Sequence, residues 1–268
     1  MEEELLTAAL PEERRLLIAA QLRRDARVRV DDLVRQFAVS GETVRRDLQV
    51  LEERGMARRV YGGAVAAHPS SWQLPPDERQ AALLDPRRAI AALAATLVEP
   101  SDTVIMDAGS TVAEAARALP GSFGGRVLCC SLPTAAELTS REGIEVHLCG
   151  GQLRRGELSC AGAAAGRFFG EYFADKAFLS AGGVHPRAGI TDSHLPENAV
   201  RQVILRQVRE CYVLADHSKI GKIAVGRVCG VTELVAVITD GGADPEAVRA
   251  IEQAGGTVLI APPAASAD

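Results

Sequence analysis

The N-terminal region is organised around one stretch, Val39-Ser40-Gly41-Glu42-Thr43-Val44-Arg45-Arg46-Asp47-Leu48, which is typical of the start of a helix. Ser40 is a favourable N-cap, because its hydroxyl can accept a hydrogen bond from an unpaired amide of the first turn. Val44, Leu48 and Leu51 recur at helical spacing, so they predict an apolar stripe that packs against a core.

Polar side chains occupy the rest of this predicted helix. Thr43, Arg45 and Arg46 lie in its first turns and away from the apolar stripe. A capped helix start with adjacent arginines suits a DNA major groove, because helix N-termini favour phosphates and arginine can form paired hydrogen bonds to a base edge. Taken alone, the stretch also fits a surface helix whose arginines are solvated.

The flanking sequence predicts the remaining elements of a winged helix-turn-helix. They are a helix over residues 12–22 that follows Pro11, a strand over 28–30, a helix over 31–37 with an aspartate cap, the helix that ends at Gly55, and a two-stranded wing over 57–65. The first helix is expected to bury Leu16, Leu17, Ile18, Ala20 and Leu22. Two residues separate the second helix from Ser40, which is the tight joint of a helix-turn-helix.

At these residues the chain resembles the DeoR family of bacterial transcription regulators. The matching residues are Val39-Ser40, Thr43 to Leu48, Leu51-Glu52, Gly55 and Arg59 to Ala64. The resemblance implies that this domain binds double-stranded DNA. The residues that we expect at the DNA are Ser40, Thr43, Arg45, Arg46, Arg58, Arg59 and Tyr61. The last three would hold the flanking phosphates.

Composition limits the classes of protein to which the chain can belong. Its 268 residues are 47% hydrophobic, which is enough for a sizeable core. No apolar run reaches the ~18 residues of a membrane span, so we expect a cytoplasmic protein without a membrane partner. The formal net charge is −5, but arginines concentrate on the predicted recognition helix and wing, and the local potential governs docking.

The cysteines show no zinc-ligand spacing, and several lie in apolar runs. They are Cys129, Cys130, Cys149, Cys160, Cys211 and Cys229. We expect buried free thiols, as in a reducing compartment, and neither a metal nor a cofactor.

Strands and helices alternate in the second part of the chain. The expected strands cover residues 103–107, 126–130, 144–149, 176–181, 211–215, 234–239 and 257–260. Apolar strands that alternate with helices predict a Rossmann-like α/β fold, with a mostly parallel sheet covered on both faces. We expect a winged-helix domain over 1–66, a linker over 67–76, an effector-sensing domain over 77–262 and a disordered tail over 263–268.

One predicted strand ends in a stretch suited to an anion, at the sheet edge where ligands bind. In Asp107-Ala108-Gly109-Ser110-Thr111, the last two residues would hold an anion with their amides and hydroxyls, and Asp107 would accept from ligand hydroxyls. An ordinary N-cap explains Ser110 as well. Gly182 and Gly183, at the end of another strand, would let a ligand approach the backbone closely.

A further strand ends in Asp216-His217-Ser218-Lys219. Lysine is rare in this chain, which has only Lys176, Lys219 and Lys222. Lys219 is therefore a candidate for a tight anion pocket, where a compact ammonium fits and a planar guanidinium does not. Asp216 would bind a hydroxyl. Together these strand ends favour a phosphorylated polar metabolite.

The DeoR resemblance extends over this second domain. It rests on Asp107 to Thr111, Gly150-Gly151, Asp175 to Phe178, Gly189 to Thr191, Glu197 and Asp216 to Gly221. It implies a sensor domain similar in fold to ribose-5-phosphate isomerases, which binds a phosphorylated sugar or a related metabolite, in repressors that form homodimers or homotetramers. The effector-binding candidates are Asp107, Gly109, Ser110, Thr111, Gly182, Gly183, Glu197, Asp216 and Lys219.

Two positions depart from the family pattern. Ser131-Leu132 stands where the family often has Thr-Asn, and Arg201 stands where a lysine usually follows Glu197. The effector is therefore expected to differ from that of the commoner members.

We interpret the chain as a transcription repressor of carbohydrate or nucleoside metabolism genes. The alternative is an isomerase-like or transferase-like enzyme with an appended winged helix, in which Asp107, Asp216 and Lys219 do acid–base chemistry. No second carboxylate is convincingly placed as a base, which argues against the enzyme. A winged helix used for protein contacts alone would not need arginines concentrated on its helix and wing.

Overall fold

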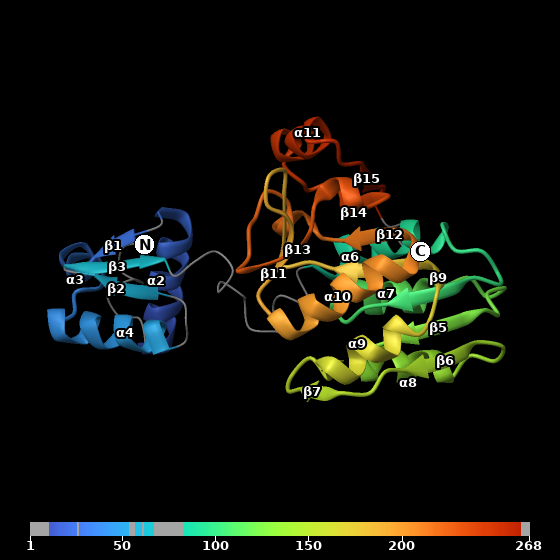
Figure 1. Cartoon of the computed structure of the whole chain (residues 1–268). Coiled ribbons are helices and arrows are strands. Elements are labelled where there is room, and N and C mark those ends of the chain that lie inside the picture. The colour runs from blue at the N-terminus through green and yellow to red at the C-terminus, as the bar shows by residue number, and fades with distance from the viewer. Residues whose placement is uncertain (1–10, 26, 54–56, 61, 67–82, 264–268) are drawn as a thin grey trace, which may run out of the picture. The chain divides into compact units, whose positions relative to one another are not determined.

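The computed structural model describes residues 11–25, 27–53, 57–60, 62–66 and 83–263 (Figure 1). The chain divides into two compact units, residues 1–75 and 76–268. The expected linker over 67–76 lies outside the described residues, as do residues 264–268 of the expected tail.

The first unit has the predicted order of a winged helix-turn-helix. Its elements are α2 (Pro11–Asp25), β1 (Arg27–Arg29), α3 (Val30–Phe37), α4 (Gly41–Glu53), β2 (Ala57–Val60) and β3 (Gly63–Ala66). The strands form an antiparallel sheet in the order β1-β3-β2. The three helices bury their apolar stripes together, among them Ile18 and Leu22 of α2, Leu33 and Phe37 of α3, and Val44, Leu48 and Leu51 of α4.

Two expectations for this unit are wrong in detail. Leu16 and Leu17 are 51% and 40% exposed, because Ile18 and Leu22 define the buried side of α2 and successive residues turn away from it by about 100°. Helix α3 begins at Val30, and Arg29 occupies the N-cap without a side-chain hydrogen bond. Asp31 therefore lies in the first turn, where a carboxylate still favours the helix dipole.

The second unit is built on a seven-stranded parallel sheet in the order β15-β14-β12-β9-β4-β5-β6. The strands are β4 (Thr103–Met106), β5 (Arg126–Cys129), β6 (Glu145–Leu148), β9 (Ala174–Ser180), β12 (Val208–Leu214), β14 (Ala236–Asp240) and β15 (Val258–Ala261). All of their pairings are parallel. The predicted α/β fold is confirmed.

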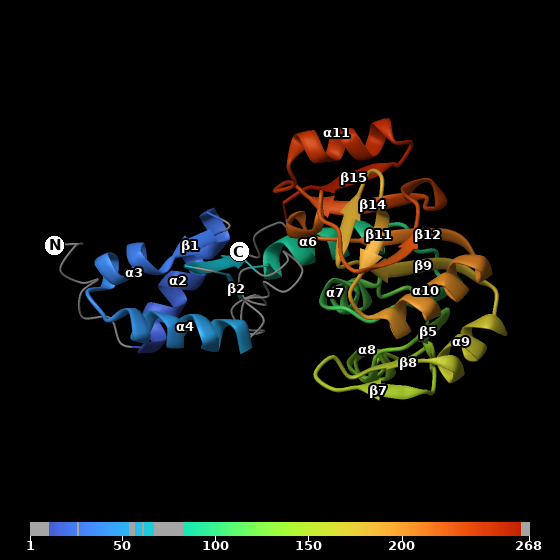
Figure 2. The ribbon, with the colours of Figure 1, turned by 60° about the vertical axis from the view of Figure 1, so that its left-hand side comes forward.

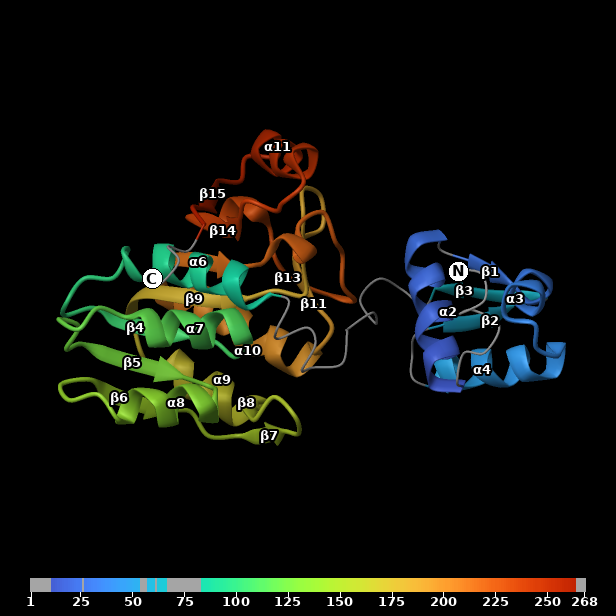
Figure 3. The ribbon, with the colours of Figure 1, turned by 180° about the vertical axis from the view of Figure 1, so that it is seen from behind.

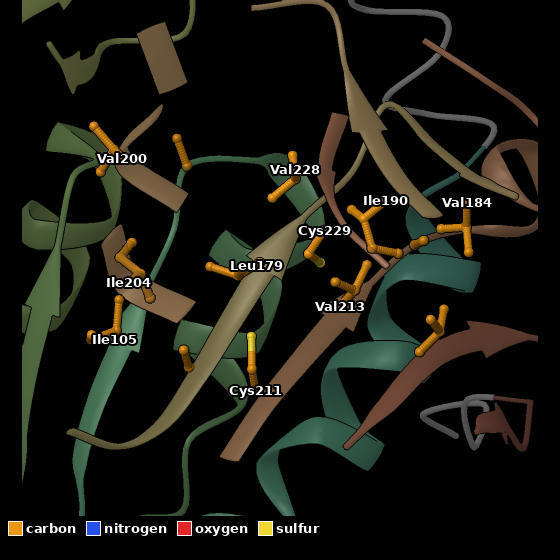
Figure 4. Close-up of a cluster of buried hydrophobic side chains, with 14 of the residues drawn as sticks. Ile105, Leu179, Val184, Ile190, Val200, Ile204, Cys211, Val213, Val228 and Cys229 are labelled. Carbon is orange, nitrogen blue, oxygen red and sulfur yellow. The ribbon is translucent and has the colours of Figure 1, made fainter. Parts of the chain in front are cut away.

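Helices cover both faces of this sheet. They are α6 (Leu84–Ala95), α7 (Ser110–Ala118), α8 (Leu132–Thr139), α9 (Ala163–Gly170), α10 (Leu195–Gln207) and α11 (Pro245–Gln253). Figures 1 and 3 show α7 and α8 on one face and α9 and α10 on the other. Each face has its own apolar cluster, and Figure 4 shows the one beneath α10, with Val200 and Ile204 near Ile105 and Leu179.

Short antiparallel elements were not predicted. They are the hairpin β7 (Gln152–Arg154) and β8 (Ser159–Ala161), and the sheet of β10 (Gly183–His185), β11 (Gly189–Asp192) and β13 (Gly226–Cys229). Figure 2 shows the hairpin below α8 and α9. Polar residues or glycine interrupt these short strands, so they lack the continuous apolar runs by which the strands of the parallel sheet were predicted.

The six cysteines are buried and form no disulfide, as expected. Burial raises the pKa of the Cys129 thiol to about 11 and that of Cys149 to about 12, which makes both unreactive. Among the described residues, no helix is long and apolar enough to cross a membrane, and no His, Cys, Asp and Glu side chains cluster as metal ligands.

Candidate DNA interface and effector site

The start of α4 is capped as its sequence predicts. The Ser40 hydroxyl accepts a hydrogen bond from the Thr43 amide at 3.1 Å, and the two hydroxyls lie 2.9 Å apart. Ala38 ends α3 in the left-handed region, with φ of 50°, which makes the turn tight. The helix therefore begins with its remaining amides available to an anion.

Asp47 fixes the other side of α4 to α2. This carboxylate is 2% exposed and accepts from Arg14 Nε at 2.6 Å and from Arg15 Nε at 2.9 Å. The hydrogen bond that Arg15 donates to Asp47 raises the pKa of Arg15 above its usual value. Asp47 follows two exposed arginines, so this ion pair determines which way Arg45 and Arg46 face. The sequence contained Asp47 in a motif but did not indicate this role.

The predicted contact residues differ in how firmly they are held. Arg46 is exposed and has no carboxylate within ion-pair distance among the described residues, whereas Arg45 Nη1 lies 3.7 Å from Glu42. Arg59 Nε donates to Glu52 at 2.9 Å, and the Arg59 amide donates to the other carboxylate oxygen at 2.8 Å. The side chain of Arg58 and the whole of Tyr61 lie outside the described residues.

The two glycines of the wing, Gly62 and Gly63, are each required for a different structural reason. Gly62 has φ of 78°, a conformation that glycine adopts without strain, and its carbonyl accepts from the Val30 amide at 2.9 Å. A Cβ on Gly63 would lie 2.0 Å from the Val28 carbonyl oxygen. Only glycine lets β1 and β3 approach this closely, so Gly63 allows the wing to pair with β1.

In the second unit, Asp107 lies just beyond β4 and is 1% exposed. It accepts from Arg201 Nε at 2.7 Å and from both the amide and the hydroxyl of Ser180 at 3.0 Å. Its second oxygen has the Cys130 thiol at 3.5 Å. Asp107 therefore joins the ends of β4 and β9 to helix α10.

Arg201 is the centre of a buried charged cluster. Besides Asp107, its guanidinium reaches Asp192 at 3.1 Å, the Ser180 hydroxyl at 2.8 Å and Glu197 at 3.7 Å. Burial opposes its charge, but Asp107 and Asp192 outweigh that effect and raise the pKa of Arg201 above its usual value. The planar guanidinium serves these partners at once, which an ammonium cannot do.

Glu197 links this cluster to the hairpin. It is 4% exposed and accepts from the Ser159 hydroxyl at 2.6 Å and from Arg154 Nη1 at 3.1 Å. The structure thus brings two predicted residues, Asp107 and Glu197, together through Arg201. The sequence did not indicate Arg154 and Ser159, because the hairpin that carries them was not predicted.

The start of α7 differs from one of the two interpretations of its sequence. Gly109 is the N-cap, so Ser110 is the first helical residue and not the cap. Gly109 has φ of 142°, and a Cβ there would lie 2.8 Å from the Ser180 Cβ. Ser110 is exposed and Thr111 is buried, which leaves the first amides of α7 at the carboxyl edge of the sheet.

The second strand end lies beyond β12. Asp216 is 3% exposed and caps the short helix His217–Lys219, accepting from the Ser218 amide at 3.1 Å and from the Ser218 hydroxyl. Lys219 is half-buried. Strands β12 and β4 flank β9, so this site and Asp107 lie two strand positions apart at the same edge of the sheet.

Gly182 and Gly183 have a structural reason to be glycine. A Cβ on Gly183 would lie 2.5 Å from the Lys222 carbonyl oxygen, and one on Gly182 would lie 3.2 Å from the Asp192 Cα. The close approach expected of a ligand is made here by the chain itself.

The sequence matches two family models. The DeoR-like helix-turn-helix domain matches residues 14–70, and the DeoR C-terminal sensor domain matches residues 84–241. The chain belongs to the DeoR family of transcriptional regulators. The resemblance of the motifs is therefore confirmed over both units, and DeoR proteins are DNA-binding regulators rather than enzymes.

Curated relatives of this DeoR protein are also named as transcriptional regulators. The regulator GolR of Listeria innocua is 31% identical over 94% of this chain and 99% of its own. The uncharacterized regulator YulB of Bacillus subtilis is 33% identical over 84% of this chain and 87% of its own, and the repressor GlcR of that organism is 31% identical over 85% and 88%.

Solved structures have lower sequence identity to this chain than these relatives do. Ribose 5-phosphate isomerase A from Methanocaldococcus jannaschii has a TM-score of 0.39 and 19% identity, over 53% of this chain and 55% of that chain. The full-length sorbitol operon regulator SorC from Klebsiella pneumoniae has a TM-score of 0.40 and 14% identity, over 88% and 97%.

Proposed function

We propose that this DeoR protein represses genes of carbohydrate or nucleoside metabolism and releases its operator when a phosphorylated sugar binds. The observation that carries the proposal is the Ser40-capped start of α4, which presents Arg45 and Arg46 while Asp47 holds the opposite side to α2. Relatives named as repressors, such as GlcR, support repression. The protein would act in the cytoplasm, where its DNA lies.

The proposed DNA contacts are divided by role. Thr43, Arg45 and Arg46 would reach base edges or phosphates in the major groove, and the Ser40 end of α4 would approach a phosphate. Arg58, Arg59 and Tyr61 of the wing would contact flanking phosphates. The DNA-binding domain would span residues 1–66, joined by the linker over 67–76 to the effector domain over 77–262.

One winged helix covers too little DNA for selective binding. We propose that the effector domains pair, so that a homodimer or homotetramer places two α4 helices in half-sites about one helical turn apart. Light scattering of the full chain at micromolar concentration should report at least a dimer. A monomer with and without DNA would refute the assembly.

The proposed effector site lies at the carboxyl edge of the parallel sheet. The phosphate would bind at the first amides of α7, with Gly109, Ser110 and Thr111, or at Lys219. Sugar hydroxyls would donate hydrogen bonds to Asp107 or to Asp216. Glu197, Gly182 and Gly183 would shape the site through the contacts described above.

The proposal is tested by selecting binding sites for the full chain from random duplexes, then titrating the selected complex with a panel of sugar phosphates. We expect one palindromic sequence and its release by one or a few members of the panel. Binding of all duplexes alike, or turnover of a sugar phosphate instead of release, would refute the proposal.

Arg46 should carry sequence information. We expect Arg46→Ala to weaken operator binding by ~1–3 kcal/mol and to leave binding to a scrambled duplex nearly unchanged. Arg59→Ala should weaken binding to both duplexes. It should also make the slope of log affinity against log salt concentration shallower by the equivalent of about one phosphate contact at most, because Glu52 already binds Arg59. Fluorescence anisotropy over a series of salt concentrations measures the affinity for each duplex and its salt dependence. Equal losses of specificity in the two variants would contradict these roles.

Lys219 should govern the response to the effector. A hydrogen bond from a charged donor is worth roughly 1.5–3 kcal/mol, so Lys219→Ala should raise the releasing concentration about tenfold to a hundredfold. Lys219→Arg should also impair release, because a guanidinium is wider than an ammonium. Lys222→Ala, which removes an exposed lysine nearby, is the matched control. Equal release midpoints in all variants would exclude Lys219 from the site.

A further inference from the structure

Strand β1 carries two arginines to which the sequence assigned no role. Along the strand, Arg27 and Arg29 are exposed, and Val28 between them packs against the core of the first unit. The strand lies at the edge of its sheet, beside β3. Side chains alternate along a strand, so both arginines project from one face, opposite to that of Val28.

The described part of the chain does not neutralise these two guanidinium groups. In the described part of the chain, no carboxylate lies within ion-pair distance of Arg27 or Arg29. Arg35 on α3 is comparably exposed, and its guanidinium pairs with Asp32 at 2.6 Å. The sequence also holds nearby acids such as Asp31, so the lack of pairing on β1 is not a shortage of carboxylates.

Both arginines line a groove between α4 and the wing. The groove has a volume of about 1070 Å³, and Arg45 of α4 and Arg59 of β2 line it too. Asp31 also lines it, and Glu42 and Glu52 partly offset Arg45 and Arg59. Figure 1 shows the sheet of this unit alongside α4. The groove thus has a positive wall on β1, facing a helix that presents arginines to DNA.

A phosphodiester strand fits such a groove. Double-stranded DNA carries one negative charge per ~1.7 Å of its axis, so a helix in the major groove has phosphates along both sides. We propose that Arg27 and Arg29 contact the phosphates of the strand that passes between α4 and the wing. The inference rests on the proposed DNA binding, and it adds a second line of contacts from an element outside the recognition helix and the wing turn.

The test is the salt dependence of duplex binding by the full chain. Each phosphate contact contributes about 0.9 to the slope of log affinity against log salt concentration, so Arg27→Gln/Arg29→Gln should make the slope shallower by about 1.8. Operator and scrambled duplex should lose affinity by the same factor, because phosphate contacts carry no sequence information. Arg27→Lys/Arg29→Lys keeps both charges and should retain the wild-type slope.

The control is Arg167→Gln/Arg209→Gln, which removes the same net charge from exposed arginines of the second unit. Its slope should equal that of the wild type. Charged residues also protect edge strands from pairing with other chains. If the β1 variant aggregates and its soluble fraction keeps the wild-type slope, edge protection is their role and the inference is overturned. If the wild type itself shows no sequence preference, the proposed function fails instead.

Discussion

Asp47→Ala should abolish operator binding. Removing this carboxylate leaves Arg14 buried without the partner that lies 2.6 Å away, and removing one member of a buried ion pair costs about 3–5 kcal/mol. Helix α4 would lose its polar attachment to α2 and keep the apolar one, so the orientation of Arg45 and Arg46 would no longer be fixed. Hydrogen exchange of the α2 and α4 amides in the full chain measures the change, which should be roughly 10²–10³-fold or more.

The matched control is Asp32→Ala. Its carboxylate also lies 2.6 Å from an arginine, but that pair is exposed to solvent. Exposed ion pairs contribute little to stability, so exchange in α2 and α4 should remain close to that of the wild type. A partial rescue by Arg14→Met/Asp47→Met would support the role of the Arg14–Asp47 ion pair, because an apolar pair can replace a buried ion pair. Similar exchange in Asp47→Ala and Asp32→Ala would contradict the role of Asp47.

Arg201→Ala should be the most damaging single change in the effector domain. It leaves the buried carboxylate of Asp107 without the charge that balances it, again at a cost of about 3–5 kcal/mol, whereas Glu197 keeps its ion pair with Arg154. We expect faster exchange in β4, β9 and α10 and no release of operator by the effector.

Arg201→Lys tests geometry against charge. It keeps the positive charge but cannot serve Asp107, Asp192 and Ser180 together, so it should be destabilised less than the alanine variant. Arg126→Ala, which breaks an ion pair with Glu145 at the protein surface, should behave as the wild type. If exchange in Arg201→Ala matched that in Arg126→Ala, the charged cluster would not stabilise the domain.

The sequence predicted what regular patterns can encode. The stripe of Val44, Leu48 and Leu51 and the cap at Ser40 located α4 correctly, and the apolar runs located the strands of the parallel sheet. Contacts between side chains that are distant in the sequence could not be predicted. Asp47 meets Arg14 across 33 residues and Arg201 meets Asp107 across 94, and no local pattern reports such a pairing.

Exposure was also poorly predicted where apolar residues are consecutive. Leu16 and Leu17 were expected inside because they are leucines, but one face of α2 cannot bury a continuous run. The glycines present the opposite case. The sequence shows Gly63 and Gly183 but not why a side chain is excluded there. In the structure, a Cβ at these positions would lie 2.0 and 2.5 Å from a neighbouring carbonyl oxygen.

The central claim is that effector binding and operator binding are coupled in one chain. It is tested most directly by measuring both affinities of the wild-type full chain, each with and without saturating amounts of the other ligand. The account predicts that the effector raises the operator Kd and that the operator raises the effector Kd by the same factor, as thermodynamic linkage requires. An effector that binds the chain yet leaves the operator Kd unchanged would contradict the account.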